Sequence, residues 1–194
     1  MSDAYFDPAE LRQAGVKATD ATSRTIVADF DTWQDWYQLQ RNNAEHRQAV
    51  TRKIKDPKWQ GPDGARLAID VLDAEGGELA VTFHVNGWNA YAGVKPGSYY
   101  ATKPLATSVA WQTVEIHLED LIPLDEDSPP AVRSWQHMTE LGLVAKVRTR
   151  RDGKPVELAG MGWPEHRQLR NLRWLGGRDT ASSGTPHQQP RSAP

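Results

Sequence analysis

Aromatic side chains among polar loop residues are the feature of this sequence best suited to chemistry. Trp59 lies in a loop rich in proline, glycine and aspartate, and Trp88 and Tyr91 lie in the long connection 86–105. A flat aromatic ring can stack on the C–H face of a sugar while polar neighbours hydrogen bond the sugar hydroxyls. Packing of each loop around a small core of its own explains the same aromatic residues equally well.

Polar side chains of two predicted strands would lie beside these aromatics. Apolar residues alternate along 78–85, so His84 points to the opposite, polar face, and Asn86 continues that parity. Glu115 and His117 occupy the polar face of a second alternating segment. We therefore expect these four side chains to form the floor of one binding site, with the loop aromatics as its walls.

Catalytic motifs give a weaker signal than the aromatics. The sequence has no Gly-x-Ser-x-Gly, phosphate-binding or dinucleotide-binding motif. Glu115 and Glu119 with a histidine would be the basis of a small carboxylate-dependent hydrolase, which is one alternative function. We expect a protein that is not an enzyme, and an interaction scaffold that binds another protein through the same face is the other alternative.

Composition narrows the class of protein further. The chain has 194 residues, with no cysteine and eight tryptophans. Its formal net charge is −2, so it does not attract nucleic acid over long range. No apolar run approaches the roughly 18 residues that span a bilayer, so no membrane partner is expected. The opening MSDAYFDPAE lacks the features of a secretory signal. The protein is then either cytoplasmic or part of a longer exported chain.

The elements that position these residues are predicted to be short strands separated by turns, which is typical of an all-β antiparallel β-sandwich or jelly roll. We expect a hairpin between 66–72 and 78–85, and a second hairpin that turns at Asp152-Gly153. Strands are predicted at 25–30, 49–55, 66–72, 78–85, 98–102, 108–118, 141–149, 155–158 and 169–174, with one helical turn within 132–138.

The predicted organisation has three parts. Residues 1–21 form an N-terminal appendage with a short helix near 8–14, residues 22–176 form the sandwich, and residues 177–194 form a disordered tail. Trp111 opens an alternating strand and Trp174 ends one, and we expect both to be largely buried. Alternation along the strands predicts a core of Phe30, Leu67, Ile69, Val71, Leu79, Val81, Phe83, Val114, Ile116, Leu118, Leu141, Leu143 and Leu172.

Four motifs, taken in order, resemble the galactose-binding-like jelly rolls that include many carbohydrate-binding modules attached to glycoside hydrolases. They are Asp29-Phe30-Asp31, the strand from Trp111 to Leu121, Leu141-Gly142-Leu143 and the closing segment from Arg170 to Trp174. The resemblance covers about residues 24–175. It implies a non-catalytic module that binds a polysaccharide or oligosaccharide, and that has a fused or neighbouring catalytic domain as its partner.

The same resemblance implies a structural calcium ion where the first and last strands meet. Asp29 or Asp31 matches the acidic ligand of the opening strand by position. Asn171 stands where many relatives have aspartate, and this departure weakens the match, because calcium takes six to eight oxygen ligands.

Overall fold

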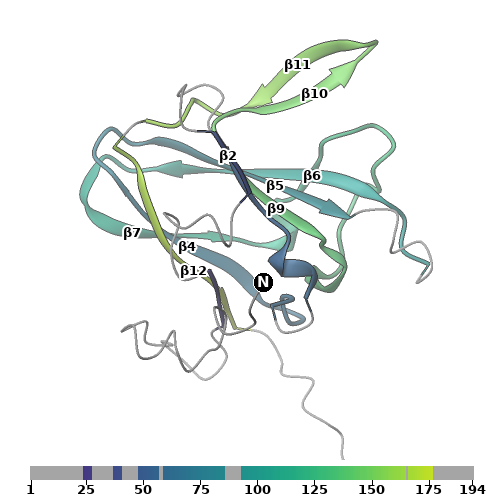
Figure 1. Ribbon diagram of the computed structural model, residues 1–194, viewed down its shortest axis with the longest axis horizontal. Helices are drawn as coiled ribbons and strands as arrows, with labels where there is room; N and C mark the ends of the chain where they lie inside the picture. The colour runs from purple at the N-terminus through teal and green to yellow at the C-terminus, as the bar shows by residue number, and fades with distance from the viewer. Residues whose placement is uncertain are drawn as a thin grey trace, which may run out of the picture.

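Two large antiparallel sheets and a separate two-stranded sheet build the structure, a computed structural model that describes residues 24–27, 37–40, 48–56, 59–85, 93–164 and 166–176. The four-stranded sheet has the order β1 (Arg24–Val27), β12 (Gln168–Leu175), β4 (Arg66–Asp73) and β7 (Ser108–Ile116). The six-stranded sheet has the order β2 (Tyr37–Gln40), β3 (Gln48–Thr51), β9 (Glu140–Val144), β5 (Gly77–Val85), β6 (Gly97–Leu105) and β8 (Ile122–Pro123). In Figure 1, β5, β6 and β9 lie above β4, β7 and β12.

The order of the strands is that of a jelly roll. If the eight principal strands β1, β3, β4, β5, β6, β7, β9 and β12 are counted along the chain, the sheets run 1-8-3-6 and 2-7-4-5. Only β5 and β6 are consecutive and adjacent, so every other connection between these eight strands crosses from one sheet to the other. The all-β antiparallel sandwich predicted from the sequence is therefore confirmed.

The predicted hairpin between 66–72 and 78–85 is wrong, because β4 and β5 belong to different sheets. The Asp73 carboxylate accepts hydrogen bonds from the backbone N–H groups of Glu75 (2.9 Å) and Gly76 (3.1 Å). Gly76 and Gly77 both have positive φ, which glycine adopts without a steric penalty. This turn carries the chain across the sandwich instead of folding it back beside β4.

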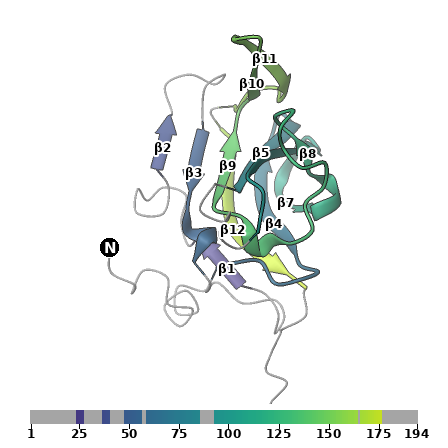
Figure 2. The same cartoon turned by 90° about the vertical axis from the view of Figure 1, so that its right-hand side faces the viewer.

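The predicted strand 141–149 is divided in two. Its first part is β9 of the six-stranded sheet, and its second part is β10 (Val147–Arg151), which pairs with β11 (Lys154–Ala159). This β10–β11 hairpin confirms the turn predicted at Asp152-Gly153 and projects from the body of the sandwich (Figures 1 and 2). The segment 49–55 also divides, into β3 and a 3-10 helix at Lys53–Lys55.

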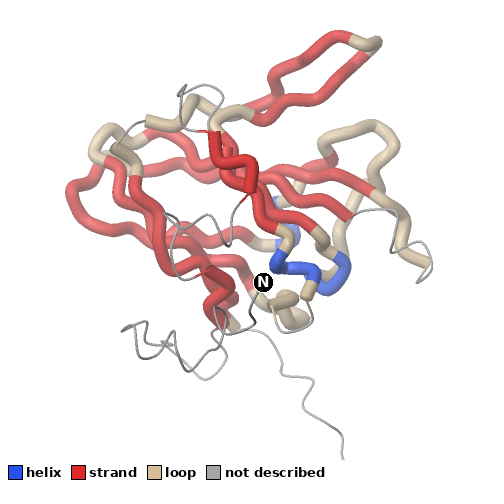
Figure 3. The backbone as a smooth tube through the Cα atoms, in the orientation of Figure 1, coloured by secondary structure: helices blue, strands red, loops and turns tan. Residues whose placement is uncertain are grey.

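Two further 3-10 helices, at Leu118–Asp120 and Trp135–His137, lie between the strands (Figure 3). The second of them confirms the helical turn predicted within 132–138. The predicted helix near 8–14 and the tail 177–194 lie outside the described residues.

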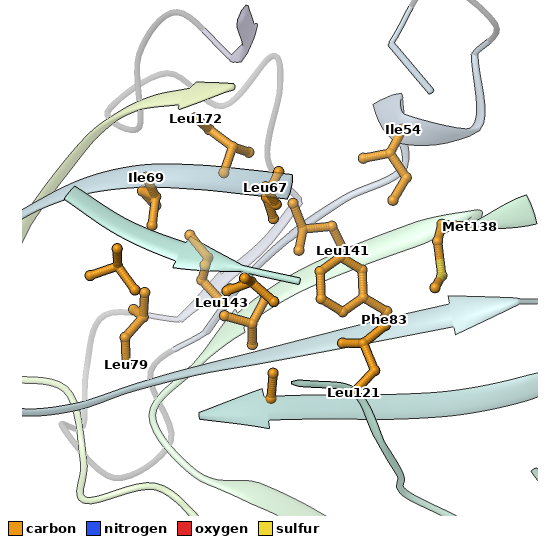
Figure 4. Packing of buried hydrophobic residues seen from close by; sticks show 14 of the residues in the cluster. Ile54, Leu67, Ile69, Leu79, Phe83, Leu121, Met138, Leu141, Leu143 and Leu172 are labelled. Carbon is orange, nitrogen blue, oxygen red and sulfur yellow. The ribbon is translucent and has the colours of Figure 1, made fainter. Parts of the chain in front are cut away.

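Side chains from both sheets form one hydrophobic core (Figure 4). Every predicted core residue within the described ranges is in it, with Leu118 partly buried at its margin, whereas Phe30 lies outside those ranges. Trp174 is fully buried as predicted, but Trp111 is only half-buried and lies on the outer face of β7, so its predicted burial is wrong.

The sequence analysis did not anticipate the central position of Trp135. Its ring packs between Phe83 and Trp174, with centroid distances of 5.3 and 5.0 Å, and its Nε1 donates to the carbonyl oxygen of Ala65 at 2.7 Å. A short 3-10 helix has no apolar periodicity, so pattern analysis had no signal with which to find this residue.

Candidate functional site

The predicted floor of the binding site does not exist as one surface. His84 lies on β5 and Glu115 on β7, and these strands belong to opposite sheets. The apolar faces of the two sheets pack against each other, so their polar faces point in opposite directions. His84 therefore lies on the outer face of the six-stranded sheet, whereas Glu115 and the neighbouring His117 lie on the side of the four-stranded sheet.

The predicted aromatic walls are divided as well. Trp59 is only 3 % exposed, and its carbonyl oxygen accepts a hydrogen bond from Nε1 of Trp174 at 2.8 Å. The packing interpretation holds for this tryptophan, because its buried ring cannot stack on a ligand. Asn86, Trp88 and Tyr91, the other predicted site residues, lie outside the described residues, so their roles stay predictions.

Glu115 and His117 are part of a partly exposed group of charges. Nε of Arg66 lies 2.6 Å from Oε2 of Glu115, so this carboxylate is already paired. The His117 ring lies 3.9 Å from Glu115 and 3.7 Å from Glu119. Glycoside hydrolysis requires two carboxyl groups set across a cleft, and neither Glu115 nor Glu119 lines the cleft that contains His84.

His84, in contrast, lines a cleft of about 670 Å³ at one end of the six-stranded sheet. Its Nδ1 lies 3.0 Å from Oγ of Ser98, which is opposite it on β6. Val85 and Gly97 complete the floor of the cleft. The alternation of β5, with Val81 and Phe83 in the core, explains why His84 faces outward.

One wall of the cleft is the loop 124–128, which hydrogen bonds to β6. The N–H of Leu124 donates to the carbonyl oxygen of Ser98 at 2.8 Å, and the N–H of Ser98 donates to Oγ of Ser128 at 2.9 Å. The opposite wall is the tip of the β10–β11 hairpin, residues 149–152. The two walls touch where Oγ1 of Thr149 donates to Oδ1 of Asp125 at 2.8 Å.

The two walls carry opposite charges. Asp125, Glu126 and Asp127 are exposed on the loop, and Arg150 and Arg151 are exposed on the hairpin. Within the described part of the chain no ion pair of 4.0 Å or less joins either arginine to these acids. Apart from Oδ1 of Asp125, which accepts from Thr149, the carboxylate acceptors and the guanidinium donors therefore remain available to a ligand in the cleft.

The outer face of the six-stranded sheet continues from the cleft and carries an aromatic side chain. Tyr100 is half-buried and lies two residues after Ser98 on β6, so the two share a face about 7 Å apart. Thr82 lies opposite both Tyr100 and Gly142. A Cβ at Gly142 would lie 2.5 Å from Oγ1 of Thr82, so a side chain there would displace the threonine.

The sequence analysis predicted one wall, the hairpin that turns at Asp152-Gly153, but not that this hairpin faces another segment. In the sequence, residues 123–130 are acidic and residues 146–154 are basic. Their opposite charges were the available signal that the segments face each other. That signal is weak, because charge complementarity does not reveal which of many exposed segments are neighbours.

The calcium site stays a prediction. Asp29 and Asp31 lie outside the described residues, and Nδ2 of Asn171 donates to Oδ2 of Asp70 at 2.8 Å. Among the described residues, no group of three or more histidine, aspartate or glutamate side chains is placed to hold a metal ion. Nor does any helix in those ranges have the length and apolar character needed to cross a membrane.

Comparison with solved structures finds similarity to carbohydrate-binding modules of Clostridium thermocellum. One is the family 11 module of a cellulosomal cellulase, with 13 % identity, a TM-score of 0.37 and coverage of 67 % of this chain and 66 % of that chain, just under two thirds of it. The other is a family 11 module in complex with a β-1,3-1,4-mixed-linked tetrasaccharide, with 11 % identity, a TM-score of 0.42 and coverage of 81 % of this chain and 98 % of that chain. No family model and no curated protein matches the sequence. Structural similarity at this level carries no argument about function.

Proposed function

We propose that this protein is a non-catalytic carbohydrate-binding module whose ligand is a neutral polysaccharide or oligosaccharide bound in the cleft between loop 124–128 and the β10–β11 hairpin. The observation that supports this most is that exposed carboxylates line one wall and exposed guanidinium groups line the other. Sugar hydroxyls both donate and accept hydrogen bonds, so they match both walls.

The floor of the cleft adds contacts of the right kind. His84 and Ser98 offer further hydrogen-bonding groups, and Tyr100 offers an aromatic face on the adjoining surface. An open polar site of this type gives micromolar to millimolar affinity, on the order of −4 to −8 kcal/mol. Trp88 and Tyr91 stay candidates for further stacking, because the segment that carries them begins directly after Val85 at the cleft floor.

The cleft does not contain a complete hydrolytic site. His84 and Ser98 have the separation of a base and a nucleophile, but a catalytic histidine also needs a carboxylate that orients it. No carboxylate of the described residues hydrogen bonds to the His84 ring or lies within 4.0 Å of its nitrogens. The incomplete site favours a binding role over catalysis, and we propose that this role supports a fused or neighbouring glycoside hydrolase.

Affinity electrophoresis tests the proposal directly. The native protein is run through gels that contain neutral polysaccharides, including a β-1,3-1,4-mixed-linked glucan, and we expect at least one to retard it. A double variant with Glu126→Gln and Arg150→Gln removes one charge of each sign from the cleft, so its net charge is unchanged. We expect this variant to lose most of the retardation.

The matched control is a double variant with Glu75→Gln and Arg133→Gln, because both residues are exposed and lie outside the cleft. It changes the charges in the same way and should be retarded like the native protein. Equal loss in both double variants would contradict a cleft site. Absence of retardation on every glycan, together with a stable protein complex in pull-down, would favour the interaction scaffold.

The hydrolase alternative makes a separate prediction. Turnover of a chromogenic glycoside or ester that disappears with Glu115→Gln would establish it and would contradict the non-catalytic proposal. We expect no turnover, because Glu115 is held by Arg66 on an open surface.

A further inference from the structure

The outer face of the four-stranded sheet carries a second polar surface, on the side opposite the cleft floor. Arg170 of β12, Asp70 of β4 and Thr113 of β7 lie directly opposite one another across the three strands. Val114 is in the core, so Thr113 faces outward, and Trp111 shares that face two residues away. We call Trp111, Arg170, Asp70 and Thr113 the outer cluster.

Arg170 stacks on Trp111 within this cluster. The guanidinium carbon lies 3.8 Å from the centroid of the tryptophan ring, which is within the range of a cation–π interaction. The Arg170 side chain remains 49 % exposed. The contact therefore holds the guanidinium group over the ring while leaving about half of the side chain exposed to solvent.

Asp70 neutralises Arg170 only in part, because the two groups form a 3.9 Å ion pair while three other groups hydrogen bond to the Asp70 carboxylate. Oδ1 accepts hydrogen bonds from Thr113 (2.8 Å) and Arg173 (3.0 Å), and Oδ2 accepts one from Asn171 (2.8 Å). The nearest approach of Arg170 to Asp70 is 3.9 Å, which is too long for a hydrogen bond.

Among the described residues, Arg170 and Arg173 of this face share the single carboxylate of Asp70. Arg66 pairs with Glu115 at 2.6 Å, and Arg173 pairs with Asp70 at 3.0 Å. The Arg170 side chain makes no hydrogen bond to any described residue, and within those residues its ion pair is the 3.9 Å contact with the same Asp70 carboxylate that Arg173 approaches more closely. The five N–H donors of Arg170 are thus available to an external acceptor, and a guanidinium group matches a carboxylate in a bidentate geometry.

We propose that the outer cluster binds a carboxylate-bearing saccharide, with the uronate group on the free edge of Arg170 and the sugar ring packed beside Trp111. This site is independent of the cleft, because it lies on the other sheet and recognises an acidic rather than a neutral sugar. The stacked aromatic favours a sugar over an acidic peptide, because a sugar ring offers C–H groups next to its carboxylate.

Calorimetric titration of the full chain with an oligogalacturonide at low salt tests the proposal. The methyl ester of the oligogalacturonide is the matched control ligand, since it keeps the sugar rings and removes the negative charge. We expect the acidic form to bind at least about tenfold more tightly than the ester, with affinity falling as salt is added. Arg170→Gln should remove this preference, and Arg170→Lys should restore only part of it.

Arg133→Gln is the matched control variant, because Arg133 is exposed and its loss changes the net charge equally. It should bind the acidic ligand like the native protein. Thermal unfolding of each variant near the native midpoint shows that the fold is retained. The cleft variant with Glu126→Gln and Arg150→Gln should also keep its affinity for the oligogalacturonide, which separates this site from the proposed function.

Three results would overturn the proposal. The first is equal weakening by Arg170→Gln and Arg133→Gln, which would show non-specific attraction only. The second is equal affinity for the acidic ligand and its ester. The third is binding of a polyglutamate peptide as tight as that of the oligogalacturonide and equally dependent on Arg170, which would assign the surface to an acidic protein segment.

Discussion

The stability of the sandwich should depend strongly on the buried ion pair between Arg167 and Asp73. Both side chains are only 2 % exposed, and Nε of Arg167 lies 2.6 Å from Oδ2 of Asp73. Arg167 also donates to the carbonyl oxygens of Glu78 (3.1 Å) and Gly162 (3.5 Å). The pair thus ties the segment before β12 to the turn between β4 and β5.

Arg167→Met should destabilise the fold strongly, because it leaves the Asp73 carboxylate buried without its counter-charge. Loss of one partner of a buried pair costs about 3–5 kcal/mol, a large part of the ~5–15 kcal/mol that holds a domain together. The two backbone N–H groups that also bond to Asp73 favour the lower half of that range. For a chain of this size, the midpoint of thermal unfolding should fall by about 6–16 °C.

Adding Asp73→Asn to Arg167→Met should recover about half of this loss. The asparagine carries no charge, and its amide oxygen can still accept the hydrogen bonds from Glu75 and Gly76. Urea unfolding of the native protein, both single variants and the double variant measures the coupling. A cost below about 1 kcal/mol for Arg167→Met, or a double variant that is less stable than both singles, would refute this reasoning.

Two further predictions concern stability. Burial tends to raise the pKa of Asp70, but hydrogen bonds from Asn171 and Thr113 and the charge of Arg173 outweigh it and leave the pKa below its ordinary value. The resulting stabilisation is present above the unfolded-state pKa of about 3.9, and it is lost as pH falls through the lower folded-state pKa. Asparagine does not titrate in this range. In the Asp70→Asn variant the urea midpoint should therefore fall less steeply below about pH 4 than in the native protein. Gly61→Ala should lower stability by about 1–3 kcal/mol in urea unfolding, because its Cβ would lie 2.5 Å from Cβ of the fully buried Trp135, and a native-like midpoint would contradict that packing.

The strands were predictable because their signal is local. Leu79, Val81 and Phe83 alternate with polar or small residues, and all three face the core, since a strand with one buried face requires that period. The same rule, applied to its own neighbours Val114 and Ile116, places Trp111 on the outer face. The sequence therefore contained the signal that Trp111 faces outward, and the prediction of a buried Trp111 overlooked it.

The site was less predictable because it depends on which sheet each strand joins. Alternation shows that His84 and Glu115 are polar-face residues, but it does not show that their strands face away from each other. The cleft arises from a loop and a hairpin that meet at Asp125 and Thr149, which are 24 residues apart in the sequence. That meeting follows from the jelly-roll connections, and no short segment of sequence encodes it.

A nitrogen-15 NMR titration of the full chain with a neutral oligosaccharide that retards it in gels tests the central claim most directly. If the cleft is the binding site, the largest amide shifts should fall on His84, Ser98, residues 124–128 and residues 149–152, while Thr113 and Arg170 on the opposite sheet stay unchanged. Shifts centred on β7 and β12, with the cleft amides unmoved at saturation, would contradict the account.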